Sequence, residues 1–208
     1  MTPDSLRPAA PSTPARVSRP PLSDTASLRA RARKRIAEGA VVDSYRADRV
    51  AVIALLNVAL ATELVCMLRY KRHGFTAKGL GAEPVAAEFH AHAAEELGHA
   101  DQLAARIVQL GGDPDFSPAG LADRAHAEYD ASPELVDMIR EDLVAERIAI
   151  ESYGEVIRFL GDDDPTTRRL IESILAVEEE HADDLAGLLV KLSPASASRN
   201  VPSKELTR

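Results

Sequence analysis

A short sequence pattern occurs twice in this chain of 208 residues. Residues 96–104 read ELGHADQLA and residues 178–186 read EEEHADDLA, with six of nine positions identical at an offset of 82. In a helix, residues i and i+3 lie on one face, so each copy can direct a carboxylate and an imidazole toward one point. The repeat therefore predicts two helices that each carry a Glu-x-x-His pair: Glu96 with His99, and Glu178 with His181.

A second repeat links the segments that precede these pairs. Glu63 comes seven residues before Tyr70, and Glu146 comes seven residues before Tyr153. Glu63 lies 33 residues before Glu96, and Glu146 lies 32 residues before Glu178. The similar spacing predicts two copies of one helix pair, with a pseudo-twofold site between them.

Four long segments without internal proline are expected to be helices, at about 46–73, 84–110, 133–160 and 165–192. Aromatic residues make up 4% of the chain and tryptophan is absent, a composition that favours helices over strands. Short connections make neighbouring helices antiparallel, whereas the roughly 22 residues between the second and third helices can cross the length of a bundle. The predicted fold is all-α: an antiparallel four-helix bundle with a long crossover between helices 2 and 3.

The segments outside the bundle differ from it in composition and charge. Residues 1–49 hold ten Lys/Arg and five Asp/Glu, while the whole chain has a net charge of −8, so residues 50–208 carry −13. We expect a flexible basic N-terminal arm at 1–45 with a short helix after Asp24, the bundle at 46–192, and a flexible tail at 193–208. The first residues lack the apolar core of a secretory signal, which favours a cytoplasmic location.

The repeated residues suit a metal centre. Glu63 interrupts an apolar run, and a buried carboxylate without a counter-charge costs several kcal/mol or more. Four carboxylates carry −4, which two divalent ions neutralise. The single cysteine, Cys66, excludes a four-cysteine zinc or iron–sulfur site. We therefore predict a dinuclear site built from Glu63, Glu96, His99, Glu146, Glu178 and His181.

One Glu from each of two helices, with Glu-x-x-His from each of the other two, resembles the di-iron site of the ferritin superfamily, and of bacterioferritin most closely. The resemblance covers about residues 46–192. It implies that Glu63 and His99 are terminal ligands of one iron and that Glu146 and His181 are those of the other. Glu96 and Glu178 would be bridges, and Tyr70 would be a catalytic residue beside the centre.

The resemblance implies a ferroxidase that uses O₂ or H₂O₂ to oxidise Fe(II), for iron storage or detoxification in a homo-oligomeric shell. A manganese catalase or a di-iron oxidase on the same ligands is an alternative, because carboxylate and imidazole sites accept manganese as well as iron. Bacterioferritins carry a haem-ligating methionine directly after the second-helix glutamate. This chain has Leu97 there, so we predict no haem by that route.

A third alternative is a DNA-binding protection protein of the miniferritin type, in which Arg29, Arg31, Arg33, Lys34 and Arg35 contact phosphates. No membrane interaction is expected, because no stretch reaches about 18 apolar residues without charge. The other histidines, His73, His90, His92 and His126, are predicted to be surface or capping residues, with His90 and His92 as candidates for feeding iron to the site. Tyr153 is given a smaller role than Tyr70.

Overall fold

The computed structural model describes residues 22–192, and within that range it contains helices and no strands. The four long helices are α2 (Arg49–Thr76), α3 (Ala82–Gln109), α5 (Leu135–Leu160) and α6 (Pro165–Leu192). Three short elements accompany them: α1 (Thr25–Ala32), the 3₁₀ turn η1 (Ile36–Glu38) and α4 (Leu121–Arg124). The predicted all-α fold is confirmed.

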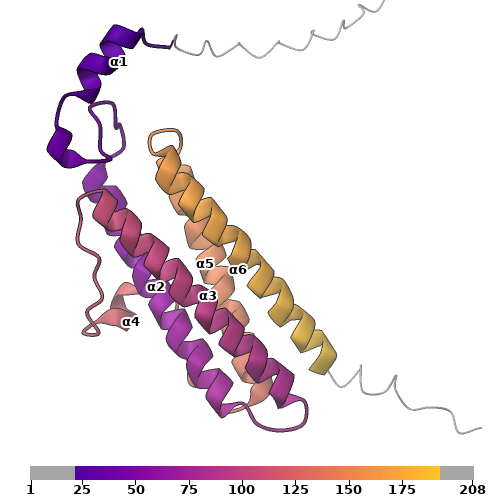
Figure 1. Cartoon of the computed structure of the whole chain (residues 1–208). Coiled ribbons are helices and arrows are strands. Elements are labelled where there is room, and N and C mark those ends of the chain that lie inside the picture. The colour runs from indigo at the N-terminus through magenta and orange to yellow at the C-terminus, as the bar shows by residue number, and fades with distance from the viewer. Residues whose placement is uncertain (1–21, 193–208) are drawn as a thin grey trace, which may run out of the picture.

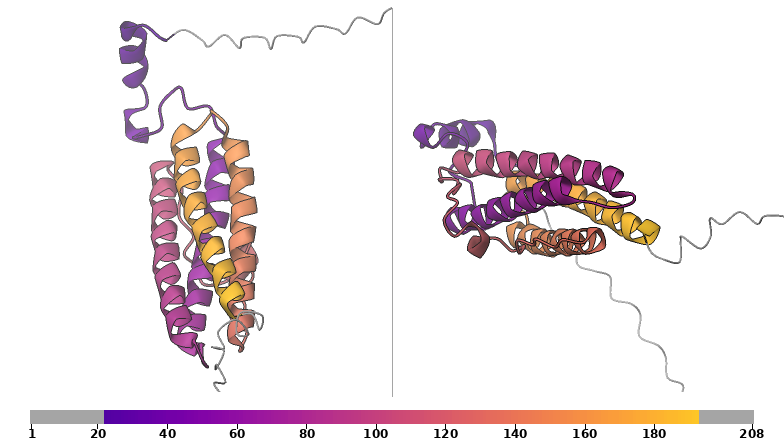
Figure 2. Two further views of the ribbon diagram at one scale, coloured as in Figure 1. Left: turned by 90° about the vertical axis from the view of Figure 1, so that its right-hand side faces the viewer. Right: turned by 90° about the horizontal axis from the view of Figure 1, so that it is seen from below.

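The long helices form an antiparallel bundle (Figures 1 and 2). Helix α2 pairs with α3 and α5 pairs with α6, while α2 also contacts α5 and α3 contacts α6. A long segment leaves the end of α3 and returns along the bundle to the start of α5, as Figure 1 shows beside α2 and α4. The predicted crossover therefore joins the two helix pairs.

Aspartates set the beginnings of two long helices. The Asp48 carboxylate accepts hydrogen bonds from the backbone N–H groups of Val50 and Ala51, so α2 begins at Arg49 rather than near residue 46. Asp164 accepts the N–H of Thr167 at 2.9 Å and caps α6, which begins at Pro165 as predicted. The third bundle helix begins at Leu135, so Pro133 lies just outside it.

Polar residues of α2 hold the crossover in place. Asn57 donates to the carbonyl of Asp113 and accepts the N–H of Asp115, and the hydroxyl of Thr62 accepts the N–H of His126. Further along α2, Arg69 donates to the carbonyl of Glu128. These bonds satisfy backbone groups of an irregular segment, which explains why polar side chains occur on this largely apolar helix.

Helix α2 is also long and apolar enough to span a membrane by length and composition, but just over half of that stretch is buried inside the bundle. A central helix of a bundle passes the same test.

The apolar core has two main clusters, one toward each end of the bundle, and a small third one made of Cys66, Ala127 and Ala145. One includes Leu56, Leu60, Leu103, Ile107 and Ile171, and the other includes Tyr70, Phe89, Met138, Ile139 and Leu185. The Glu-x-x-His segments of α3 and α6 lie between the residues of these two clusters along each helix. Consequently, the polar site occupies the middle of the bundle, with apolar packing on both sides.

The basic segment before the bundle contains the short helix that was predicted after Asp24. The Asp24 carboxylate accepts the N–H of Ser27 and caps α1, and Lys34 forms an ion pair with Asp43 at 3.0 Å. The proposed boundaries of the arm and tail remain predictions, because residues 1–21 and 193–208 lie outside the described range.

Candidate metal centre

All six residues predicted from the repeats come together in the middle of the bundle. Each is at most 5% exposed. Each of the four long helices contributes one carboxylate, and α3 and α6 also contribute one imidazole each. The set is Glu63, Glu96, His99, Glu146, Glu178 and His181, and we refer to it as the carboxylate–histidine cluster.

The cluster divides into two overlapping groups of four. In each group, four potential ligand atoms lie within 4.8 Å of one another. Glu63 and His99 belong only to the first group, Glu146 and His181 belong only to the second, and both Glu96 and Glu178 belong to each. This sharing is the arrangement expected of two adjacent ions with two bridging carboxylates.

The two imidazoles point into the cluster. The Nδ1 atom of His99 lies 2.9 Å from Glu178 Oε1 and 3.2 Å from Glu63 Oε2. The Nδ1 atom of His181 lies 3.4 Å from both Glu96 Oε1 and Glu178 Oε2. When ligand atoms bind one metal at about 2.0–2.2 Å, the ligand atoms themselves lie about 3 Å or more apart, as they do here. Little rearrangement is therefore needed to admit ions.

Two tyrosines form equivalent hydrogen bonds to cluster carboxylates, and each bond joins one helix pair to the other. The Tyr70 hydroxyl of α2 donates a hydrogen bond to Glu146 of α5, and the Tyr153 hydroxyl of α5 donates one to Glu63 of α2. Both tyrosines are 1% exposed. The two contacts are equivalent, as the repeated seven-residue spacing indicates, and the smaller role of Tyr153 remains a prediction.

Burial and mutual repulsion govern protonation of the cluster. Burial, followed by the charge of Glu63, raises the pKa of Glu96, and burial with the charge of Glu178 raises the pKa of Glu146. Burial opposes charge on His99, but close contacts with Glu178 and with other carboxylates raise its pKa to about 12. Protons therefore supply the positive charge that the carboxylates require when no metal is bound.

His181 resembles His99, whereas the pKa of Glu178 shifts in the opposite direction to those of Glu96 and Glu146. Burial opposes charge on His181, but its close contact with the Glu178 carboxylate and the charge of Glu146 raise its pKa to about 9. Burial likewise acts to raise the pKa of Glu178, but close contacts with the imidazoles of His181 and His99 outweigh it and lower that pKa to about 2. Glu178 is therefore ionised between the two imidazoles.

Several buried atoms of the cluster form no hydrogen bond among the described residues. They are Glu96 Oε1, Glu146 Oε2, both carboxylate oxygens of Glu178, and His181 Nδ1. Buried polar atoms usually have partners, and an unpaired buried carboxylate oxygen is costly. The unpaired atoms face a common centre, and hard oxygen and imidazole donors suit iron or manganese. The residues thus fit a dinuclear metal centre of the di-iron type.

His92 was predicted at the surface, and that prediction is wrong. His92 is 2% exposed and its ring stacks on His181, with ring centroids 4.0 Å apart, and it forms a T-shaped contact with the ring of Tyr70. Burial, followed by the charge of His181, lowers the pKa of His92 to about 4. The outer nitrogen of His181, Nε2, lies 2.7 Å from Glu95 Oε2, a contact that orients a ligand imidazole.

The surface prediction for His73 is also wrong. His73 is fully buried, and its Nδ1 atom lies 2.8 Å from Asp142 Oδ2. Arg69 pairs with Asp142 Oδ1 at 3.2 Å. These residues, which we call the arginine–aspartate network, bind α2 to α5 near the end of the crossover. Nothing in the local sequence identifies partners that are about 70 positions apart.

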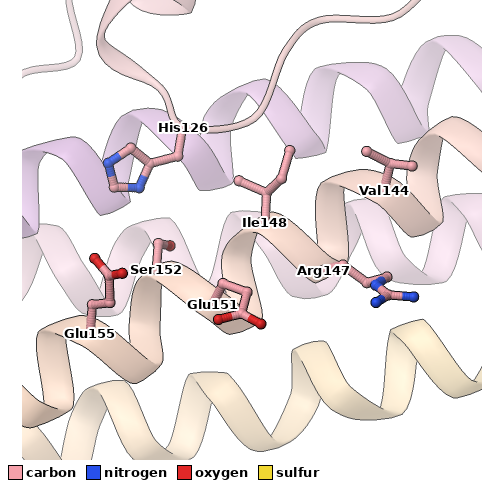
Figure 3. A pocket seen from close by; sticks show the side chains of 7 residues that line it. All are labelled: His126, Val144, Arg147, Ile148, Glu151, Ser152 and Glu155. Carbon is pink, nitrogen blue, oxygen red and sulfur yellow. The ribbon is translucent and has the colours of Figure 1, made fainter.

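Two other features lie outside the cluster. Leu97 is 42% exposed on α3, and the absence of haem at that position remains a prediction. A surface pocket between the crossover and α5 contains no cluster member; Figure 3 shows its lining residues, His126, Val144, Arg147, Ile148, Glu151, Ser152 and Glu155.

Two curated proteins illustrate the range of relatives. The bacterioferritin of Desulfovibrio desulfuricans is 32% identical over 139 residues, covering 65% of this chain and 73% of that protein. The nutrient stress-induced DNA-binding protein of Synechococcus sp. is also 32% identical over 139 residues, covering 64% of this chain and 78% of that protein. Both alignments have the length of the helical bundle.

Among solved structures, the dodecameric thioferritin of Bacteroides fragilis, a bacterioferritin-related protein, aligns with a TM-score of 0.70 and 32% identity. The alignment covers 74% of this chain and 93% of that protein. The family model described as the ferritin-like domain matches residues 53–194, which include all four long helices except the first residues of α2. This chain therefore belongs to the ferritin-like family.

Proposed function

We propose that the protein is a ferroxidase, which oxidises Fe(II) to Fe(III) at the carboxylate–histidine cluster. The observation that carries the proposal is the sharing of Glu96 and Glu178 between two four-residue groups in which several buried atoms lack hydrogen-bond partners. Such a site holds two cations close together and apart from bulk water. Membership of the ferritin-like family supports iron as the substrate.

Two Fe(II) ions are the substrate, and together they supply two electrons. With O₂ as the oxidant and two protons, the products are two Fe(III) and H₂O₂; with H₂O₂ and two protons, they are two Fe(III) and two water molecules. Glu63 and His99 bind one ion, Glu146 and His181 bind the other, and Glu96 and Glu178 bridge them. Because the cluster carries four carboxylates, it favours the additional positive charge of the product.

Tyr70 is the proposed catalytic tyrosine. Its buried hydroxyl donates to Glu146, a proposed iron ligand, and its ring contacts His92. This position allows Tyr70 to hold Glu146 in one orientation and to exchange a proton with the site. Tyr153 has the equivalent contact with Glu63, so we assign it a positioning role for that carboxylate.

Storage of the oxidised iron requires a hollow assembly. The Bacteroides fragilis relative is a dodecamer. We propose that this chain also forms a homo-oligomeric shell in the cytoplasm, in which the bundle oxidises Fe(II) and the Fe(III) product collects in the interior.

The experiment is aerobic Fe(II) oxidation, followed in the near-ultraviolet, with metal content assayed on the same samples. We expect rapid oxidation of about two irons per chain and its loss in the Glu63→Ala/Glu146→Ala double variant. Asp101→Asn/Asp183→Asn is the matched control, because both residues are exposed acids on α3 and α6. Equal rates in the wild type and the ligand variant would contradict the proposal. Tightly held manganese with peroxide disproportionation would instead identify a catalase.

A DNA-binding role is the second candidate, since one relative is a DNA-binding protein and the N-terminal segment is basic. Its charge is partly neutralised, because Lys34 and Arg35 both lie within 4 Å of Asp43. A mobility shift in low and high salt, with and without residues 1–45, tests this role. Salt-sensitive retention that disappears on deletion would support it, and unchanged retention would contradict it.

A further inference from the structure

A third group of potential metal ligands lies beside the carboxylate–histidine cluster. Glu88 and His92 come from α3 and Asp184 comes from α6, and one ligand atom from each lies within 4.8 Å of the other two. The Nε2 atom of His92 lies 3.5 Å from Glu88 Oε1 and 4.0 Å from Asp184 Oδ2. Atoms bound to one metal at about 2.0–2.2 Å are separated by about 3–4.4 Å, so the spacing is suitable for a cation.

Two of the three residues are accessible from the surface, and the third is buried. The side chains of Glu88 and Asp184 are 40% and 60% exposed, whereas that of His92 is 3% exposed. His92 is held by its stacking on His181, and its Nδ1 atom is buried with no hydrogen-bond partner. One buried imidazole thus contacts a proposed iron ligand with its ring face and directs a nitrogen toward two accessible carboxylates.

The group has no counterpart in the other half of the repeat. At the offset of 82, Leu170 corresponds to Glu88, Ile174 corresponds to His92, and Gln102 corresponds to Asp184. Leu170 and Ile174 belong to the apolar cluster around Leu56 and cannot bind a metal. Within the described bundle, the third group of ligands therefore exists only beside His181. The pseudo-twofold symmetry of the cluster does not extend to it.

We propose that Glu88, His92 and Asp184 form a third divalent-cation site, which loads Fe(II) onto the side of the cluster held by Glu146 and His181. The inference rests on the proposed ferroxidase for the identity of the cation. Two carboxylates and one neutral imidazole bind a divalent ion with fewer ligands than the cluster offers. We therefore expect Fe(II) to bind this site more weakly than it binds the cluster, which allows the ion to move on to the cluster.

The first test is an anaerobic Co(II) titration of the full chain, followed by visible absorption and by metal analysis, because Co(II) occupies such sites without being oxidised under these conditions. We expect three equivalents per chain in the wild type and two in Glu88→Gln/Asp184→Asn. The control is again Asp101→Asn/Asp183→Asn, which changes the same charges on the same helices and should retain three equivalents. Equal stoichiometry in the wild type and the Glu88/Asp184 variant would overturn the site.

The second test measures initial Fe(II) oxidation rates against Fe(II) concentration in the same proteins. Loss of a loading site should raise the half-saturating Fe(II) concentration several-fold and leave the maximal rate unchanged. An unchanged half-saturating concentration in a variant that has lost its third Co(II) would overturn the loading role. If the wild type oxidises no Fe(II) yet binds a third Co(II), the ferroxidase proposal fails and the cation site stands.

Discussion

The arginine–aspartate network and the carboxylate–histidine cluster are both buried in the bundle, but they differ in how their charges are balanced. In the arginine–aspartate network, Arg69 and Asp142 carry opposite charges, and Asp142 also contacts His73. In the carboxylate–histidine cluster, four carboxylates face only two imidazoles, so negative charge is in excess. In the described part of the chain, both groups contain buried atoms without a hydrogen-bond partner, including Arg69 Nε and His73 Nε2 in the network, so the balance of charge is what separates them. The first group balances its charge with protein atoms alone. The second requires protons or cations from outside, which distinguishes a structural group from a binding site.

The largest expected effect comes from removing the negative charge of the arginine–aspartate network. Asp142→Leu leaves Arg69 buried without its counter-charge, and we expect a loss of about 3–5 kcal/mol in the free energy of unfolding. Urea denaturation of the metal-free protein measures this loss. The exposed Asp101→Asn should change stability by no more than about 0.5 kcal/mol. A similar small change for Asp142→Leu would show that the network is unimportant.

The cluster should respond in the opposite way to loss of a carboxylate. Glu146→Gln removes one of four crowded carboxylates while its amide oxygen can still accept the Tyr70 hydroxyl, so metal-free stability should stay equal or rise. The wild type should gain about 4 kcal/mol at a free metal concentration 1,000 times Kd. We expect most of that gain to disappear in Glu146→Gln. Thermal unfolding with and without Co(II) measures both effects, and an equal metal-induced gain in the two proteins would contradict the ligand assignment.

The metal-free and metal-loaded proteins should also differ in how their stability depends on pH. His181 has a pKa raised from the ordinary 6.5 to about 9, so its stabilising contribution is complete below about pH 6.5 and is lost as the pH rises to 9. Metal-free protein should therefore unfold at lower temperature as the pH is raised from 6 to 9. Metal-loaded protein should show a smaller decrease, because its imidazoles are already deprotonated. Identical pH profiles for the two forms would contradict this account.

The smallest effects should come from the two tyrosines. Tyr70→Phe and Tyr153→Phe each remove one buried hydrogen bond to a carboxylate, and we expect a loss of about 1 kcal/mol in each case. Because their contacts are equivalent across the repeat, the two losses in metal-free protein should be similar. Urea denaturation measures them. A loss confined to one variant would show that the two halves of the cluster are not equivalent.

The sequence predicted the features that repeat within it. Both Glu-x-x-His pairs, the two single glutamates and the order of the four helices could be derived from spacing, because a helix places i and i+3 residues on one face whatever surrounds it. Helix ends were less accurate. The cap at Asp48 was a local signal for the start of α2 that the prediction passed over.

Buried histidines were not predictable in the same way. His73 and His92 each resemble a surface residue when only their own helix is considered. His73 is buried because Asp142 of α5 approaches it, and His92 is buried because His181 of α6 stacks on it. Partners from other helices depend on the rotation and packing of the whole bundle, which helical periodicity alone does not determine.

The most direct test of the central claim is a crystal structure of the protein soaked anaerobically with Fe(II), with anomalous scattering measured at the iron edge. The account predicts two adjacent iron peaks within the carboxylate–histidine cluster, bridged by Glu96 and Glu178, and no iron in the arginine–aspartate network. A cluster without iron, or with a single central ion, would contradict the claim that its unpaired carboxylates form a two-iron site.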